Sequence, residues 1–301
     1  MPPFSCNLGA ALLAIATLAA CPVVAAQESP WRSFISVSPV FEDADLDKGG
    51  DFSVGGVLLR AGSSRELGQG SRAGITLNYD YYDYSFNNPV AFGGAAPWHI
   101  VQRYGFAVPI STALQDGWTL GVTPSLDWFK ENGAKSGDAQ VWGATVTAVK
   151  RFDDGNLLGF GVAAFSQIED TSYFPVLIVR WRFGERWQLV NPLAAGPTGP
   201  AGLELDYIFD NGWTVGFGAA YRRTRFRLSE NGPTPNGIGQ ISGVPVFFRA
   251  TRDLGAAVTL NLYAGVIANG QLEVNDPSGN LIRKEDFELG PLVGANLVFR
   301  F

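Results

Sequence analysis

The chain has few of the residues on which most catalytic and metal sites depend. Its 301 residues include two cysteines, one histidine and one methionine. Both cysteines, Cys6 and Cys21, lie within the first 26 residues, which excludes a disulfide framework for the remainder. Because His99 is the only histidine, a zinc site would have to be built almost entirely from carboxylates. We therefore predict no metal and no cofactor.

Long apolar runs and amphipathic helical stretches are also missing after residue 26. No run of about 18 or more apolar residues follows, which excludes a membrane-spanning helix. The 37 glycines and the 13% aromatic content favour strands joined by tight turns. The net charge of -6 argues against nucleic acid or an anionic lipid surface as a partner.

Residues 8–26 form an uncharged run, rich in Ala and Leu, that ends in Val24-Ala25-Ala26. This is the small-residue pattern after which signal peptidase cuts. We predict a cleaved signal peptide at residues 1–26 and a mature domain at 27–301, although no Lys or Arg precedes the apolar run. A membrane anchor and a lipoprotein lipidated at Cys21, which follows Leu18-Ala19-Ala20, remain alternatives.

The clearest alternation lies at the end of the chain. Every second residue is apolar, namely Phe287, Leu289, Pro291, Val293, Ala295, Leu297, Phe299 and Phe301. A period of two indicates a strand with one apolar face. A terminal aromatic residue is typical of the closing strand of a bacterial outer-membrane β-barrel. We predict that Phe301, Phe299 and Leu297 form the signal read by the barrel-assembly machinery during insertion.

Turn-forming residues divide the rest of the chain into alternating segments. The short candidate turns are residues 62–71, 111–117, 153–156, 184–185, 210–212 and 252–255. Longer or more polar connections alternate with them, at residues 42–51, 85–97, 130–138, 169–172, 191–202, 229–243 and 268–286. This layout predicts an all-β fold, a single antiparallel transmembrane β-barrel of about 14 strands with short periplasmic turns and longer extracellular loops. If the short strand at residues 187–190 and one neighbour are absent, the count drops to about 12.

The segment from Trp118 to Trp128 allows a check of dimensions. Its even-numbered residues are apolar and its odd-numbered residues are small or polar. It would be about 33 Å long at roughly 3.3 Å per residue, and a tilt of about 40° reduces its height to roughly 25 Å, the apolar band expected of such barrels. We predict that Trp118 and Trp128 lie at the two membrane interfaces. Trp213 follows a turn in the same way as Trp118 and is predicted at the turn side.

Charged residues identify the inward face, because a basic residue facing lipid costs about 2–4 kcal/mol at the midplane. The predicted lumen-lining residues are Arg180, Arg182, Arg249, Glu204, Asp206 and Asp127. Arginine opposite carboxylate would narrow a channel and sort solutes by size and charge. Paired charges that merely fill the interior are the alternative. A third possibility for Arg223, Arg225 and Arg227 is contact with lipopolysaccharide phosphates above the bilayer. Phe174, Val176, Ile178 and Phe247 fall on the same inward face, which leaves room for an apolar path or a partly packed interior.

Residues 191–205, which include the Pro- and Gly-rich loop, resemble a family of bacterial outer-membrane β-barrels catalogued only as a domain of unknown function. Residues 118–124, 218–222 and 243–246 resemble further stretches of that family. The resemblance extends from about Trp31 to the end of the chain. It implies the fold and the outer-membrane location and brings no activity or catalytic residues.

Two functions are compatible with such a barrel. The first is a passive channel for small solutes, and the second is a non-conducting barrel whose extracellular loops bind a partner or lipopolysaccharide. A hydrolase would need His99 as base beside a serine such as Ser111 or Ser125, and nothing in the sequence brings these together, so we predict no enzyme and no catalytic residue. A soluble exported β-sandwich is the competing fold. The expected partners are outer-membrane lipid, lipopolysaccharide and the assembly machinery, and the oligomeric state is left open.

Two connections carry unusual composition. Glu42, Asp43, Asp45, Asp47 and Asp51 could hold Ca²⁺ through oxygen ligands, but their spacing does not match a calcium loop and we expect a solvated outer loop. The Pro- and Gly-rich loop at residues 192–200 is expected to be exposed, with folding over or into the barrel mouth as the alternative.

Overall fold

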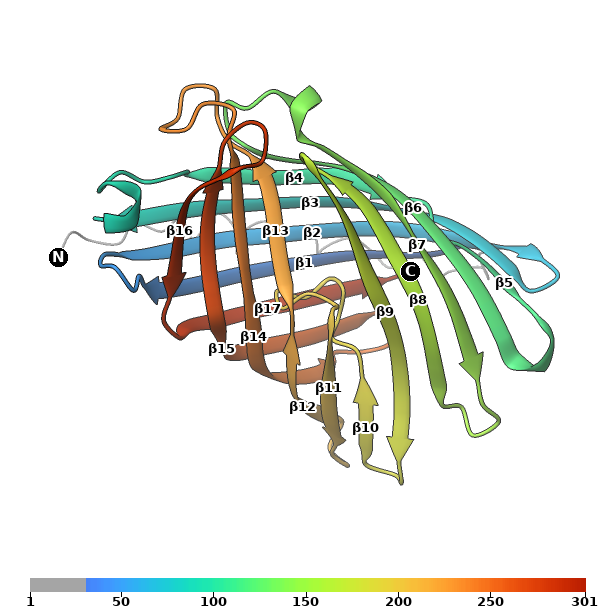
Figure 1. The fold of residues 1–301 in the computed structure, drawn as a ribbon. Helices are drawn as coiled ribbons and strands as arrows, with labels where there is room; N and C mark the ends of the chain where they lie inside the picture. Colours follow the sequence, from blue (N-terminus) through green and yellow to red (C-terminus); the bar gives the residue numbers. More distant parts are fainter. Residues whose placement is uncertain (1–30) are drawn as a thin grey trace.

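A computed structural model describes residues 31–301, so the predicted signal peptide at residues 1–26 lies outside the described part. These residues form one closed antiparallel β-barrel (Figure 1). Its strand segments are β1 (Trp31–Asp45), β2 (Asp51–Gly68), β3 (Ser71–Asn87), β4 (Ile100–Ala107), β5 (Ile110–Ala113), β6 (Trp118–Glu131), β7 (Gln140–Arg151), β8 (Leu157–Gln167), β9 (Asp170–Phe183), β10 (Trp187–Val190), β11 (Gly202–Ile208), β12 (Trp213–Ala220), β13 (Arg222–Arg227), β14 (Ile238–Asp253), β15 (Val258–Asn275), β16 (Leu281–Phe287) and β17 (Gly290–Arg300). Short 3-10 helices lie in three connections, η1 (Val90–Phe92), η2 (Gln115–Gly117) and η3 (Ser136–Ala139). No helix in this part of the chain is long and apolar enough to cross a membrane.

The seventeen segments make fourteen wall strands. β4 and β5 both lie between β3 and β6, and Pro109, which cannot donate to the ladder, sits where they are interrupted. In the same way β12 and β13 share the edge of β14, and β16 and β17 share the edge of β15. β17 pairs with β1 and closes the wall. The prediction of about 14 strands is confirmed, and the alternative of 12 is wrong because β10 is present.

Many large apolar side chains of the wall face outward and are exposed. Leu120, Leu205 and Val293 are 45%, 41% and 48% exposed. In a β-sandwich these residues would be buried between two sheets. The sandwich alternative is therefore wrong.

Short and long connections gather at opposite ends of the barrel. The turn end carries residues 69–70, 114–117, 152–156, 184–186, 209–212 and 254–257, together with Trp31 and Phe301. The loop end carries residues 46–50, 88–99, 132–139, 168–169, 191–201, 228–237 and 276–280. The alternation matches the prediction, but several strands run further than expected. β15 and β16 extend into residues 268–286 because their inward side chains, such as Leu272 and Val274, continue to pack in the interior.

One change of face was not predicted. Phe287 and Val293 were expected to share the outward face, yet Phe287 is 5% exposed and packs inside, while Val293 is 48% exposed. The irregular residues Glu288 and Leu289 between β16 and β17 shift the alternation. The predicted apolar stripe is therefore continuous only within β17.

The wall is incomplete on one side, beside the shortest strands. β10 and β11 have 4 and 7 residues, whereas β9 has 14. On β9, only Arg180–Phe183 at its end pair with β10. β11 pairs with β10 and β12 but not with β13. Toward the loop end, no ladder among the described strands joins β9 to β13 (Figure 1). β13 instead makes one parallel bridge to β6, between Arg227 and Lys130. We call the stretch between the edges of β9 and β13, residues 170–179 and 222–227, the seam.

Candidate channel interior

Apolar side chains fill the interior of the loop end between β1–β4 and β13–β17. The core includes Trp98 and Phe226, both 0% exposed, whose ring centroids lie 5.2 Å apart at 87°. Phe287 packs edge-on against Phe52 at 5.1 Å. The Phe287 ring lies on Gly270, where an added Cβ would be 1.9 Å from the ring, so the strand glycine provides the space for the aromatic cover. This core fills the part of the loop-end interior that lies between β1–β4 and β13–β17.

β13 separates that core from the rest of the interior. Phe226 belongs to the core, whereas the alternate residues Arg223, Arg225 and Arg227 contact the connections of β6–β9. Arg225 Nε donates to the Ile168 carbonyl at 2.7 Å. Arg227 Nε donates to the carbonyl of Asp138 at 2.9 Å, its Nη1 donates to the Asn236 and Pro277 carbonyls at 2.9 and 3.2 Å, and its Nη2 bonds Glu169 at 3.1 Å. Arg225 and Arg227 are thus 9% and 5% exposed, which leaves them unavailable as an open surface for lipopolysaccharide.

Inward residues of β6–β9 are less tightly covered than the core. They are partly accessible and mostly small or uncharged, namely Thr119, Gly121, Thr123, Ser125, Thr145, Thr147, Gly161, Phe174, Val176 and Ile178. We call this surface the hollow side. Its shape follows from composition, because Gly, Thr and Ser remove little volume from a lumen that larger side chains would fill.

Arg249, Glu204 and Asp206 meet on the inward face of β11 and β14. Arg249 Nε donates to Glu204 at 2.7 Å, and its Nη2 donates to Asp206 at 3.3 Å. Both carboxylates are 1% exposed. Gly216 on β12 leaves the space for them, since a Cβ there would lie 2.0 Å from a Glu204 oxygen and 2.2 Å from an Asp206 oxygen. The group is a packed ion network rather than an open ring of charge.

Asp127 belongs to a second network on the opposite wall. It accepts hydrogen bonds from Asn78 at 2.7 Å and from Arg103 at 3.1 and 3.2 Å. Asp80 next to it is paired with Arg60 and lies 3.8 Å from Arg103. Two arginines for two carboxylates make this network neutral.

Arg180 and Arg182 share the inward register but join neither network. Val190 of β10 pairs with both Arg180 and Glu204, and Gln188 pairs with both Arg182 and Asp206, so the two arginines lie on the face of the buried acids. Both are exposed, and among residues 31–301 no ion pair includes them. Arg151 lies in the same inward register through Leu157 and is exposed as well. The interior near the turn end therefore carries three arginines without an ion pair in the described chain, beside a network that has one arginine for two carboxylates.

The connection between β10 and β11 was expected to be exposed, and this expectation is wrong. Residues 191–201, which we call the crossing loop, fold into the interior, where Gly196, Pro197 and Thr198 are buried. The Ser38 hydroxyl on β1 donates to the Ala195 carbonyl at 2.6 Å, and Arg222 Nη1 donates to the Pro197 carbonyl at 3.2 Å. Polar groups of β1 and β13 thus satisfy loop carbonyls that would otherwise need water.

The acidic connection near Glu42 also differs from a simple solvated loop. Glu42 is 6% exposed and accepts two hydrogen bonds from Arg222, at 2.5 and 2.7 Å. Within residues 31–301, no group of three or more His, Cys, Asp or Glu side chains is placed to hold a metal ion. Glu42 therefore acts in positioning Arg222, which in turn holds the crossing loop.

The predicted interface aromatics and the closing strand lie on the outer wall. Trp118 and Trp213 are near the turn end, beside Lys150 at 6.0 Å and Arg252 at 5.2 Å respectively. Trp128 lies toward the loop end and stacks on Tyr104 at 5.4 Å. Leu297 and Phe299 pair with Val37 and Ile35 of β1, and the Phe301 N–H bonds the Ser33 carbonyl at 3.0 Å. Their roles in membrane placement and insertion stay predictions.

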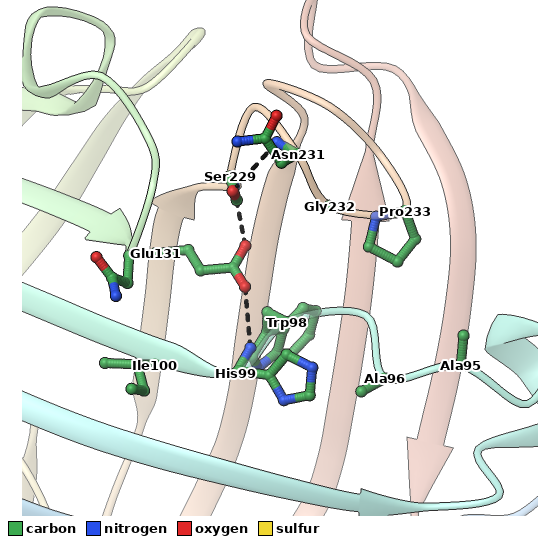
Figure 2. A pocket seen from close by; sticks show the side chains of 11 residues that line it. Ala95, Ala96, Trp98, His99, Ile100, Glu131, Ser229, Asn231, Gly232 and Pro233 are labelled. Atoms are coloured by element: carbon green, nitrogen blue, oxygen red, sulfur yellow. Dashed lines mark hydrogen bonds between the residues drawn. The ribbon is translucent and has the colours of Figure 1, made fainter.

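A cavity of about 440 Å³ opens at the loop end, lined by Trp98, His99, Glu131 and Ser229 (Figure 2). The Glu131 carboxylate accepts the backbone N–H groups of His99 at 3.0 Å and Ser229 at 2.8 Å. The Ser229 hydroxyl accepts from Asn231 N–H at 3.2 Å rather than bonding the imidazole. Glu131 therefore joins two loops. Ser229 and His99 both line the cavity, but the Ser229 hydroxyl is not hydrogen-bonded to the His99 imidazole.

The two serines considered for a hydrolase lie elsewhere. Ser111 is on β5 beside the turn end and Ser125 is on β6, whereas His99 immediately precedes β4 at the loop end. Lys135 and Glu230 provide a further link between loops around the cavity, at 2.6 Å, and this hydrogen bond raises the pKa of Lys135. The cavity wall is thus built from contacts between connections.

We expect the Glu131→Ala variant to loosen the loops on either side of this cavity. Two backbone N–H groups would lose a charged acceptor, and hydrogen bonds to charged groups contribute about 1.5–3 kcal/mol each. Limited proteolysis of the folded protein should then cut residues 229–233 several-fold faster. Glu131→Gln, which keeps one acceptor oxygen, should show a smaller effect, and equal cutting of all three proteins would contradict the link.

Comparisons with known proteins give the fold. No family model and no curated protein matches the chain. The COG4313 outer membrane channel from Pseudomonas putida F1 is 12% identical, with a TM-score of 0.53 over 93% of this chain and 99% of that one. The chain has the fold of an outer-membrane β-barrel. The Pseudomonas putida toluene transporter TodX is 11% identical with a TM-score of 0.44, over 91% of this chain and 90% of that one. The translocator domain of autotransporter NalP from Neisseria meningitidis is 12% identical with a TM-score of 0.39, over 97% of this chain and 96% of that chain.

Proposed function

We propose that this barrel is a passive outer-membrane channel for small solutes and that the hollow side is its path. The observation that carries the proposal is the difference between the two sides of the interior. Inward residues of β1–β4 and β13–β17 are largely buried in the core or in ion networks, whereas many of those of β6–β9, such as Thr119, Thr147 and Val176, are partly accessible, with buried exceptions such as Asp127 and Ala163. A barrel filled only for stability would be expected to pack both sides.

The charges support a narrow and weakly anion-attracting path. The Asp127 network is neutral, whereas the Arg249 network has one arginine for two carboxylates. Arg151, Arg180 and Arg182 are the inward arginines near the turn end that have no ion pair in the described chain, and we propose that this end is periplasmic. Membership of the uncharacterised barrel family, contact with lipopolysaccharide and insertion through the last strand belong to the same proposal.

Conductance in a planar bilayer tests the proposal. We expect small discrete steps, since the core and the crossing loop occupy part of the lumen. In a salt gradient, the Arg180→Ala/Arg182→Ala double variant should have a weaker anion preference than the parent, because fixed lumen charges set ion selectivity. Arg252→Ala, which removes an arginine beside the outward Trp213, should leave the reversal potential unchanged. Folded protein that gives no steps would overturn the proposal.

A non-conducting barrel with binding loops is the second candidate. The apolar core around Trp98 and Phe226 favours it, because it closes the loop end more completely than a simple pore requires. The cavity beside Glu131 would then be the first surface to examine for a ligand.

A further inference from the structure

Along the seam the edges of β9 and β13 are not paired with each other at a height where the wall should be closed, and the β13 edge meets another strand only at the Arg227–Lys130 bridge to β6. Backbone groups facing hydrocarbon cost several kcal/mol each when unpaired, which is why spanning sheets normally close completely. Here the chain that could continue β10 and β11 turns inward as the crossing loop instead. The edges of β9 and β13 are thereby left apart over residues 170–179 and 222–227.

The lower limit of the seam is set by one side chain. Asn191 Oδ1 accepts the Val179 N–H at 2.8 Å, and Asn191 Nδ2 donates to the Leu177 and Gly202 carbonyls, both at 3.0 Å. The Asn191 side-chain amide thus bonds the backbone groups of β9 that a neighbouring strand would otherwise pair with. Alternate residues of a strand point their backbone groups the same way, so the next position along this edge is Pro175, which has no N–H to leave unpaired. Sequence and hydrogen bonding both fit an edge that stays open above Asn191.

The upper limit is set by β13. Arg223 Nη2 lies 3.3 Å from Asp170, and Arg225 and Arg227 bond Ile168 and Glu169 at 2.7 and 3.1 Å. These bonds hold the β8–β9 connection against β13 and cap the hollow side at the loop end. The loop end of the hollow side is therefore covered by these contacts, whereas the seam beside it has no strand pairing between β9 and β13.

Both faces of β9 along the seam are apolar. Phe174, Val176 and Ile178 face the hollow side and are partly accessible. On the outward face Tyr173 and Leu177 are 71% and 50% exposed, with Pro175 between them. We propose that the seam is a side portal that connects the hollow side with the lipid and admits small apolar molecules. This inference rests on the proposed channel, and it names the class of solute and the place where that solute leaves the barrel.

Fluorescence quenching by lipid tests the portal directly. The described chain contains no cysteine, so a single Val176→Cys site can carry a small fluorescent label in protein folded into vesicles. Thr147→Cys is the matched control, because Val176 and Thr147 both pair with Gly161 and so lie inward at one height. Phospholipids brominated on their acyl chains should quench the label at position 176 several-fold more than the label at 147. Leu177→Cys gives the value for full lipid exposure.

The outcomes separate the portal from the channel. If brominated lipid quenches the label at position 176 no more than the label at position 147, the portal is overturned, whatever the conductance. A silent bilayer combined with strong quenching at 176 would overturn the channel and leave the opening in the wall. Asn191→Ala, which removes the bonds that end the seam, should increase lipid quenching of a label at inward position 178 and leave that at position 147 unchanged. No change at position 178 would mean that Asn191 does not limit the portal.

Discussion

Replacing residues 193–200 with a short Gly-Ser linker is expected to raise the single-channel conductance many-fold. The crossing loop lies inside the barrel, where it is bonded by Ser38 of β1 on the far wall and by Arg222 of β13, so its removal would clear lumen that solute cannot now use. Asn191 and Gly202 are kept in this variant, which preserves the bonds that tie β9 to β11. Planar-bilayer recording of the refolded protein measures the effect.

Point variants on β1 provide the control for the loop. Ser38 donates to the loop carbonyl of Ala195, whereas Ser33 bonds Ser63 of the neighbouring strand. Ser38→Ala should increase brief openings or current noise, and Ser33→Ala should behave as the parent. An unchanged conductance after complete loop replacement would show that the loop does not obstruct the path.

Gly216→Ala is expected to be among the most destabilising substitutions of the wall. The added methyl group would overlap carboxylate oxygens of both Glu204 and Asp206, and these cannot move without losing Arg249. Breaking a buried ion pair costs about 3–5 kcal/mol, because a charge is left without its partner. Urea unfolding in lipid vesicles should show a midpoint well below that of the parent, with less heat-resistant folded band on a gel.

A glycine on another strand supplies the comparison. Gly55 on β2 has no atom within 4 Å of an added Cβ, and Gly55→Ala should leave the unfolding midpoint close to the parental value. If Gly216→Ala is equally well tolerated, the carboxylates have room to separate, and the network is less tightly packed than the distances indicate.

The period-two alternation allowed the wall to be predicted from the sequence. Segments such as Trp118–Glu131 carry large apolar residues on the outward face and small or polar residues on the inward face, so local pattern and tertiary environment agree. The short β10 was also predicted, because Trp187 to Val190 lies between turn residues. Alternation failed to give strand lengths at the loop end, where residues 268–286 were predicted as a connection although β15 continues to Asn275.

The interior was less accessible to sequence reasoning. Charge identified Arg249, Glu204 and Asp206 as inward residues, but no local pattern specifies that one arginine is shared by both acids. The inward course of residues 191–201 depends on hydrogen bonds to Ser38 and Arg222, which are distant in the sequence. The alternation of Arg225, Phe226 and Arg227 was visible, yet no local pattern shows that all three side chains are buried, with Phe226 in the apolar core and the arginines bonded to the loops of the hollow side.

The crossing loop also has a consequence for assembly. It lies near the middle of the chain, but the Ala195 carbonyl is bonded by Ser38, 157 residues earlier, and approached by Asn296, 101 residues later. Ser38 and Asn296 become neighbours only when the first and last strands have joined. Docking of the loop must therefore follow closure of the cylinder, so a probe on Ala195 would report the final step of biogenesis rather than the insertion of individual hairpins.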